Sequence, residues 1–421
     1  MKVLQLNTFD VEGGAALAAW RLHLGLRDAG VDSKMLVQTK TGTDATAIER
    51  DTASARALGQ LRPWLEALPL LMYRGRPATH WATEWVPTRI TEQIHDEKPD
   101  IIHLHWVCRG FMSVADIGGV SQGPRGTPVV WTLHDSWAFT GGCHVPGHCT
   151  KYRQQCGLCP QLNSREGDDL SRHTWERKNL LWTETPLTIV TPSDWLARCA
   201  RDSSLFKTRR VEVIPNGIDT SRMAPMPRDE ARAELALPQD KKLILLCAMN
   251  AVQDTNKGFR HLEEALRKLA GTGWRDRVEL VVVGQAAPPT PVDTGVPTRF
   301  LGVLKGEEAM RRVYSAADLT VLPSLQENLP NSIMESMACG TPVTAFGIGG
   351  IPQLVEHDVT GYLARPQDDA DLAAGLEYIL SDSARRDRMG MQARLKIERE
   401  FDTRLTAKRY HDLYEQLLAN R

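Results

Sequence analysis

Short apolar runs alternate with longer amphipathic segments along the chain. In its first half, the apolar runs predict buried strands at residues 3–7, 34–38, 101–105, 129–133, 187–191 and 211–214. Helix-forming stretches separate several of these runs, and the first of them, residues 15–22, comes before Gly30. Short buried strands that alternate with helices are typical of a parallel sheet covered on both faces.

The alternation restarts after residues 214–219. Further strands are predicted at residues 243–248, 279–283, 319–322 and 342–345, and helices at 258–270 and 331–339. The pattern therefore predicts an α/β chain with two doubly wound, Rossmann-like units. We expect these units to face a cleft at the carboxyl ends of both sheets, where open α/β sheets bind ligands. Residues 384–421 predict a helical tail.

Composition differs between the two halves of this 421-residue chain. Ten of the eleven tryptophans and six of the eight cysteines precede residue 200. Two halves this different indicate two domains with different tasks. We expect an amino-terminal domain at residues 1–212 and a carboxyl-terminal domain at 213–400.

Charge and hydropathy exclude some partners. Lys and Arg total 51 against 52 Asp and Glu, so the net charge of −1 gives no reason to expect nucleic acid as a partner. Apolar runs such as residues 243–249 are far shorter than the roughly 20 residues of a membrane span. The chain begins directly with a strand and shows no signal-peptide pattern, so we expect a cytoplasmic protein whose membrane contact, if any, is peripheral.

Residues 323–343 carry the most specific chemistry. A strand ends near Pro323, a loop carries Glu327, and a helix begins at Pro330 or Asn331. Pro suits a first helical turn, and the N–H groups of that turn form an anion site suited to a diphosphate. Glu335, one turn into the helix, could accept hydrogen bonds from two ribose hydroxyls, and Glu327 could reach the sugar.

These residues resemble a known signature. Glu327 and Glu335, with seven residues between them and followed by Met-Ala-Cys-Gly-Thr-Pro-Val at 337–343, are similar to the motif of retaining family-4 glycosyltransferases of the GT-B fold. Further matches are residues 214–219, Lys257-Gly258, residues 349–355, Gly361 and Gly13-Gly14.

The resemblance implies that the second domain binds a nucleotide sugar, UDP- or GDP-linked, and that the nucleoside diphosphate leaves with retained anomeric configuration. It assigns charge neutralisation on that leaving group to Lys257 and sugar contact to Glu327. Glu335 would bind the ribose, and Asn331 and Ser332 would supply backbone donors to the phosphates. No catalytic cofactor is expected. In this fold the last helix, residues 401–421, returns to pack on the first domain.

One position departs from the family pattern. Many relatives carry an arginine five residues before the lysine, where this chain has Val252. One phosphate contact is therefore missing or supplied by another residue.

In the first half, a strand ends at His134, and the resemblance gives this histidine a hydrogen bond to sugar hydroxyls. The alternative is a histidine that caps a turn beside Asp135. Gly13 and Gly14 follow the first strand and open a helix, which allows close backbone approach to phosphate or sugar. His103 and His105 share one face of a strand, and we expect them to be hydrogen-bonded or to line the acceptor site rather than to bind metal.

Four cysteines fall within 17 residues. In a reducing compartment this spacing favours structural zinc, held by Cys143, Cys149, Cys156 and Cys159, although disulfides or free thiols remain alternatives. Residues 131–143 and the cysteine run that follows are similar to bacterial exopolysaccharide glycosyltransferases of the colanic acid biosynthesis type. That similarity covers mainly residues 100–165 and implies an acceptor-side insertion at 141–162.

These observations predict a hexosyltransferase that extends a glycan, with a lipid-linked acceptor expected. A basic cluster suits either an anionic membrane surface or ordinary solvation: Arg198, Arg201, Lys207, Arg209 and Arg210. Two other functions stay open. A sugar-nucleotide 2-epimerase shares the paired-domain fold, and Val252 is compatible with a catalytically weakened protein that only binds sugar nucleotides.

Overall fold

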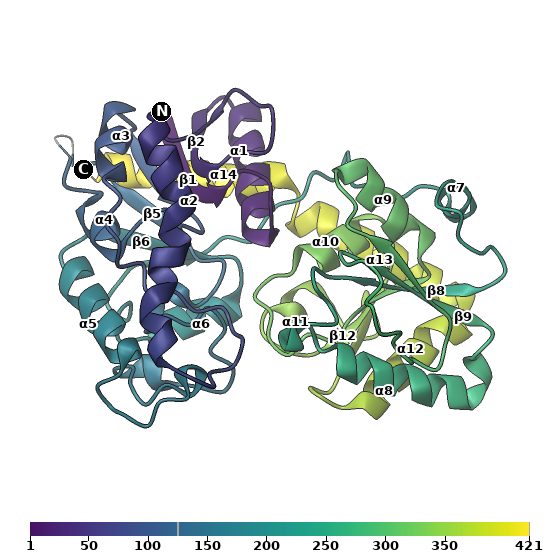
Figure 1. Ribbon diagram of the computed structural model, residues 1–421. Coiled ribbons are helices and arrows are strands. Elements are labelled where there is room, and N and C mark those ends of the chain that lie inside the picture. Colours follow the sequence, from purple (N-terminus) through teal and green to yellow (C-terminus); the bar gives the residue numbers. More distant parts are fainter. Residues whose placement is uncertain (124–125, 421) are drawn as a thin grey trace. The chain divides into compact units, whose positions relative to one another are not determined.

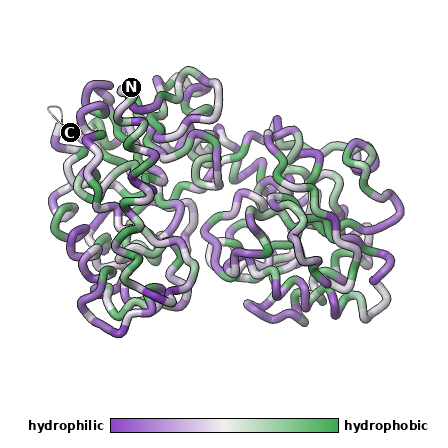
Figure 2. The backbone as a smooth tube through the Cα atoms, in the orientation of Figure 1, coloured by the Kyte–Doolittle hydropathy of each residue, from purple (hydrophilic) through white to green (hydrophobic). Residues whose placement is uncertain are grey.

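The computed structural model describes residues 1–123 and 126–420, which form two compact units (Figure 1). Unit 1 contains residues 1–217 together with the chain from residue 404 onward, and unit 2 contains residues 218–403. The sequence placed these boundaries after residues 212 and 400. Hydrophobic backbone segments concentrate in the centre of each unit (Figure 2).

Unit 1 is built on a seven-stranded parallel sheet with strand order β3-β2-β1-β4-β5-β6-β7. Its strands are β1 Lys2–Phe9, β2 Asp32–Thr39, β3 Ala47–Ile48, β4 Ile101–Leu104, β5 Val129–Thr132, β6 Leu187–Thr191 and β7 Val211–Val213. Its helices are α1 Gly14–Asp28, α2 Ala53–Ala67, α3 Ile90–Asp96, α4 Val114–Gly119, α5 Leu170–Trp182, α6 Asp194–Asp202 and α14 Thr403–Ala419.

Both faces of this sheet are covered, because alternate strand residues enter two separate cores. Leu4 and Trp131 belong to the core that also contains residues of α4, α5 and α6. Their neighbours Val3 and Val130 pack instead with α1 and α14. The carboxyl-terminal helix thus returns to unit 1, as predicted.

Unit 2 has a six-stranded parallel sheet with strand order β10-β9-β8-β11-β12-β13. Its strands are β8 Lys242–Cys247, β9 Val278–Val283, β10 Thr298–Gly302, β11 Leu319–Leu322, β12 Val343–Phe346 and β13 Gly361–Ala364. Its helices are α7 Arg228–Glu234, α8 Phe259–Leu269, α9 Glu307–Ala316, α10 Asn331–Ala338, α11 Ile351–Leu354, α12 Asp369–Ser381 and α13 Ser383–Glu400. Two cores again lie on opposite faces of the sheet, one around α8 and α12 and the other around α10.

The predicted pair of doubly wound parallel sheets is confirmed, with some differences. The hydrophobic pattern missed the short strands β3, β10 and β13. The predicted helical tail consists of two helices, since α13 and α14 are separated at residues 401–402. There the backbone N–H of Ile218 donates to Phe401 O at 2.9 Å, and the N–H of Thr403 donates to Ile218 O at 3.0 Å. The break therefore coincides with the point where the chain leaves unit 2.

Among the described residues, every helix is too short or too polar to serve as a membrane-spanning segment.

Candidate active site

Lys257 and Glu327, which sequence motifs single out separately, form an ion pair in unit 2. Lys257 Nζ lies 2.8 Å from Glu327 Oε1, and both side chains are largely buried. The Glu327 carboxylate raises the pKa of Lys257 above its ordinary value, which outweighs the opposite effect of burial. Lys257 is therefore a fixed cation near neutral pH.

Backbone contacts between two loops bring this pair together. Lys257 ends a short 3₁₀ turn at Thr255–Lys257, and the loop with Glu327 follows β11. The N–H of Leu325 donates to Asn256 O at 2.8 Å. Gly258 has φ +67°, and a Cβ there would lie 1.9 Å from Pro323 O, so only glycine allows this approach.

A second glycine fixes the other side of the Glu327 loop. Gly349 has φ +55°, and a Cβ at this position would lie 1.9 Å from the carbonyl oxygen of Glu327. The next residue, Gly350, donates its backbone N–H to the same oxygen at 3.2 Å. The glycine pair of residues 349–355 thus holds the backbone of Glu327.

Helix α10 begins four residues after Glu327 and carries the remaining predicted donor-site residues. Asn331 and Ser332 form its first turn, and the preceding Pro330 provides no side-chain cap. Glu335 is buried one turn later, and the Tyr314 hydroxyl of α9 donates to its Oε2 at 3.0 Å. A helix start of this kind favours anions through its N–H groups and dipole.

Val252 is hydrogen-bonded to Gln285, a residue that the sequence analysis did not single out. The backbone N–H of Val252 donates to Gln285 Oε1 at 3.0 Å, and Gln285 follows the carboxyl end of β9. The side chain of Gln285 is buried, and its Nε2 has no hydrogen-bond partner among the described residues. A lone glutamine after a strand gives no motif by which sequence reasoning could have recognised it.

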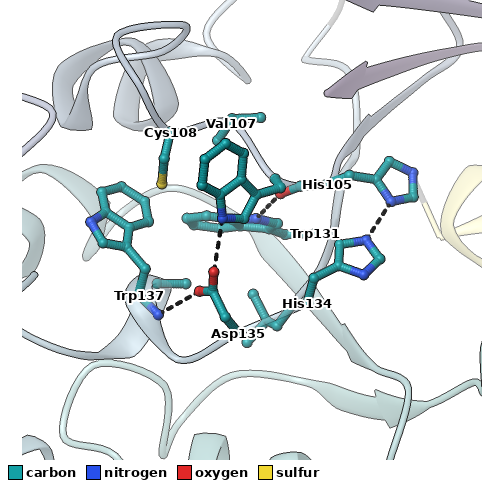
Figure 3. Close-up of a pocket in the computed structure, with 10 residues that line it drawn as sticks. His105, Val107, Cys108, Trp131, His134, Asp135 and Trp137 are labelled. Atoms are coloured by element: carbon teal, nitrogen blue, oxygen red, sulfur yellow. Dashed lines mark hydrogen bonds between the residues drawn. The ribbon is translucent and has the colours of Figure 1, made fainter. Parts of the chain in front are cut away.

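In unit 1, His134 follows β5 and contacts His105, which follows β4 (Figure 3). His134 Nε2 lies 3.1 Å from His105 Nδ1, and the two rings are stacked with centroids 5.4 Å apart. Burial lowers the pKa of His134 to about 4 and lowers that of His105 well below its usual value. Both imidazoles are therefore neutral at physiological pH.

Asp135 organises the loop that begins at His134. Its carboxylate accepts hydrogen bonds from the Trp106 indole at 2.8 Å, the Trp137 backbone N–H at 2.8 Å and the His144 ring at 2.7 Å. Figure 3 shows the bond from Trp137 to Asp135. Burial alone would raise the pKa of Asp135, but His144 and these hydrogen bonds lower it. These three hydrogen bonds hold the loop that follows His134.

His103 and His105 are hydrogen-bonded and buried, as expected. His103 Nε2 lies 2.8 Å from Thr132 Oγ1, and His103 Nδ1 lies 2.7 Å from the hydroxyl of Tyr414 in α14. Both ring nitrogens of His103 are thereby used within the protein.

Gly13 and Gly14 follow β1 in the same sheet as His134. Gly13 precedes α1 with φ +91°, and a Cβ there would meet nothing within 4 Å. Its backbone conformation, not lack of space, is what favours glycine.

The four clustered cysteines lie in one insertion. Cys143, Cys156 and Cys159 are buried and Cys149 is partly exposed. Burial raises the pKa of the three buried thiols. In the described part of the chain, no three of these sulfurs lie within 4.8 Å of one another. This arrangement does not by itself form a closed tetrahedral zinc site.

Comparisons with known proteins agree with this architecture. Residues 12–222 match the family described as Glycosyltransferase Family 4, and residues 241–382 match Glycosyl transferases group 1. A D-inositol 3-phosphate glycosyltransferase from Actinosynnema mirum is 27% identical over 86% of this chain and 88% of its own. One from Geodermatophilus obscurus is 33% identical, but the match covers 44% of this chain and 43% of that protein.

Solved structures show the same fold at low sequence identity. Sucrose-phosphate synthase from Thermosynechococcus elongatus has a TM-score of 0.70 at 20% identity, with both chains fully covered. The Anabaena protein Alr3699/HepE, in complex with UDP and glucose, has a TM-score of 0.66 at 18% identity, covering 99% of each chain. These neighbours confirm the GT-B fold. By the match over residues 12–222, half of its length, the chain belongs to glycosyltransferase family 4 and is a glycosyltransferase.

Proposed function

We propose that this glycosyltransferase moves a hexose from a UDP- or GDP-sugar to a glycan acceptor, with retention of anomeric configuration. The observation that carries the proposal is the Lys257–Glu327 ion pair, whose glutamate lies in the loop that leads into α10. A diphosphate at this helix start would meet both N–H donors and a fixed cation. The UDP and glucose in the Anabaena neighbour support a nucleotide-sugar donor.

The residues divide the work as follows. As the C1–O bond to the diphosphate breaks, Lys257 stabilises the negative charge on the leaving group. The acceptor hydroxyl forms the new C1–O bond on the same face, and its proton passes to the departing diphosphate. Glu327 contacts the transferring sugar, and Glu335, oriented by Tyr314, accepts hydrogen bonds from the ribose. In unit 1, His134 hydrogen-bonds to a sugar hydroxyl.

A donor panel tests this function. UDP- and GDP-hexoses are incubated with the protein, with and without glycan acceptors, and free nucleoside diphosphate is measured. Release that depends on Lys257, and that survives Lys268→Ala on the exposed side of α8, supports transfer. Interconversion of sugars without acceptor would identify an epimerase. Binding without turnover would identify a catalytically weakened protein that only binds sugar nucleotides. Val252, in place of the expected arginine, is the reason to test this alternative.

For the acceptor, we propose a lipid-linked glycan of bacterial surface or exopolysaccharide synthesis, reached at an anionic membrane. The support is an exposed apolar strip on α2 and the following 3₁₀ turn, Leu68–Met72. Trp64, Leu71 and Met72 are 77%, 73% and 75% exposed. The full strip is Leu58, Leu61, Trp64, Leu65, Leu68, Leu71 and Met72.

The charges around this strip suit an anionic bilayer. Arg56 and Arg74 are exposed beside it, whereas Glu66, the one carboxylate within residues 52–76, is buried. Glu66 accepts hydrogen bonds from Thr83 and from the backbone N–H groups of residues 85 and 86. An apolar face with tryptophan and flanking arginines is typical of helices that lie in a membrane interface.

Vesicle sedimentation separates this surface from other uses. We expect binding to phosphatidylglycerol vesicles, weaker binding to phosphatidylcholine vesicles, and loss of binding in Trp64→Ser/Leu71→Ser. Leu180→Ser, at a leucine 79% exposed on α5, is the matched control and should bind normally. Equal binding of both variants would contradict the membrane role, and a dimer that only the first variant disrupts would assign the strip to a second copy of the chain.

We also propose that the cysteine insertion binds structural zinc after a local rearrangement that draws the four sulfurs together. Its support is the ligand type and spacing. Metal analysis of reduced protein purified without chelator should find about one zinc per chain. The same analysis of the variant Cys156→Ser/Cys159→Ser should find no zinc. Metal-free wild-type protein with an unchanged melting temperature on zinc addition would remove the proposal.

A further inference from the structure

His134 lies at one end of a continuous hydrogen-bonded chain that crosses unit 1 and ends at a partly exposed carboxylate, Asp44. The connected side chains are, in order, Asp44, Thr46, His23, Ser33, Gln5, His105 and His134. They come from residues that follow β2 and from α1, β2, β1 and the ends of β4 and β5. The direction of every bond in this chain follows from its Asp44 end.

Asp44 can only accept. The Thr46 hydroxyl lies 2.5 Å from Asp44 Oδ1, and this bond, with that from the Thr46 backbone N–H, lowers the pKa of the Asp44 carboxyl. The single hydroxyl hydrogen of Thr46 is therefore given to Asp44. His23 Nε2, 2.8 Å from the same hydroxyl oxygen, must then be the N–H that donates to it.

The next two bonds inherit this direction. Burial lowers the pKa of His23 to about 4, so at neutral pH the ring holds one proton, on Nε2, and its Nδ1 accepts. The donor to Nδ1 is the Ser33 hydroxyl, 2.9 Å away. The Ser33 oxygen, having given its hydrogen to His23, accepts from Gln5 Nε2 at 3.0 Å.

The chain then reaches the candidate active site. Gln5 Oε1 accepts from His105 Nε2 at 2.9 Å, which leaves His105 Nδ1 as an acceptor in this neutral ring. His134 Nε2 lies 3.1 Å from that Nδ1 and must carry the hydrogen. Figure 3 shows the two rings with this bond between them.

We infer that the hydrogen-bonded chain from Asp44 fixes His134 as its Nε2–H tautomer, so that any hydrogen bond His134 makes through Nδ1 is one that it accepts. Gln5, His23, Ser33, Thr46 and His105 are positioning residues in this arrangement. The consequence for catalysis rests on the proposed function. His134 then recognises a sugar hydroxyl as a donor, and a substrate group that can only accept is disfavoured.

The reverse polarity is chemically possible, which gives the inference a sharp test. Without the Thr46 hydroxyl, His23 could carry its proton on Nδ1, Ser33 and Gln5 could turn over, and His134 would end with its proton on Nδ1. Asp44, through Thr46, is what selects one polarity. Thr46→Val removes the hydroxyl with little change in shape, and Thr46→Ser retains it as the matched control.

Nitrogen-15 NMR of the full-length protein with labelled histidine reads the tautomer directly, and His134→Gln assigns the signals. We expect protonated Nε2 at His134 in the wild-type protein and in Thr46→Ser, and a mixture of tautomers in Thr46→Val. If the two tautomers become equally populated, the apparent affinity for the donor falls about twofold, so KM in Thr46→Val rises about twofold with little change in kcat. Thermal melting checks that both variants are folded.

Two results would overturn the inference: a proton on Nδ1 of His134 in the wild-type protein, or an unchanged tautomer in Thr46→Val. The proposed role of His134 in catalysis fails separately, if His134→Gln turns over donor at the wild-type rate. In that case the tautomer measurement still decides whether the chain of hydrogen bonds has the stated direction.

Discussion

The candidate functional groups of unit 2 are charged, whereas those of unit 1 are neutral. Unit 2 presents an ion pair, in which Lys257 is held charged by Glu327. Unit 1 presents neutral groups, because burial keeps the His105 and His134 rings uncharged and hydrogen bonds set their orientation. A fixed charge suits a diphosphate, and neutral directional groups suit sugar hydroxyls. The two units therefore differ in the kind of ligand group that their candidate residues suit.

The largest expected effect is acid unfolding of unit 1 before unit 2. Burial lowers the pKa of His103 to about 3 and those of His23 and His134 to about 4, from 6.5. For these histidines, between pH 6.5 and about 4 the unfolded chain binds more protons than the folded one, so their contribution to stability falls as pH falls. Asp135 reduces this loss at His134 by favouring its charged form, and Glu66 and Glu84 act in the opposite direction, because burial raises their pKa.

Fluorescence can separate the units in this experiment, because ten of the eleven tryptophans precede residue 200 and Trp274 alone lies in unit 2. We expect the tryptophan signal of unit 1 to change at higher pH than the far-ultraviolet circular dichroism that both units share. His173→Gln, at an exposed histidine, is the control and should leave the profile unchanged. Coincident transitions by both probes would show that the buried histidines do not set acid stability.

The next effect concerns the ion pair of unit 2. Glu327→Ala should lower kcat about 10²–10³-fold, because it removes a charged group proposed to touch the transferring sugar. Glu308→Ala, at an exposed glutamate of α9, should retain wild-type kinetics. Equal activity of the two variants, with intact circular dichroism, would contradict the placement of Glu327 in the site.

Lys257→Ala sharpens the comparison from the binding side. It should weaken nucleoside diphosphate affinity about tenfold, equivalent to about 1.4 kcal/mol, while Lys268→Ala leaves it unchanged. Calorimetry with UDP and GDP measures both. An unaltered affinity in Lys257→Ala would place the diphosphate elsewhere.

The sequence was informative where chemistry is local and uninformative where it depends on distant contacts. The helix start at Asn331 and the loop glutamate Glu327 follow from neighbouring residues. The contact of Lys257 with Glu327 joins residues 70 positions apart, and only the fold brings it about. The tail break at residues 401–402 arises from pairing with Ile218, which no helical periodicity records.

In unit 1, the roles of buried polar residues could likewise not be predicted from the sequence. Gln5 and Ser33 occupy positions in apolar strands where a polar residue has no sequence signature of function. Their roles depend on partners in other elements, such as His105 and His23, and are visible only once the sheet is assembled. The exposed apolar strip on α2 was missed for the opposite reason, since apolar residues at helical spacing normally predict a buried face.

The smallest expected effect tests whether the proposed diphosphate site in unit 2 lacks a cation. Val252 stands where the family resemblance implies an arginine. Its backbone N–H donates to Gln285, whose buried Nε2 has no hydrogen-bond partner among the described residues. If the diphosphate site lacks one cation, Val252→Arg should tighten nucleoside diphosphate binding by about 1 kcal/mol, roughly fivefold, and the gain should shrink at high salt.

The control is Val303→Arg, at an exposed valine of the same unit, which should give no gain in affinity. An equal gain in both variants would mean that the added charge attracts the anion only at long range. No gain at Val252 would mean that the site is already complete, with the Gln285 amide rather than an arginine facing the ligand.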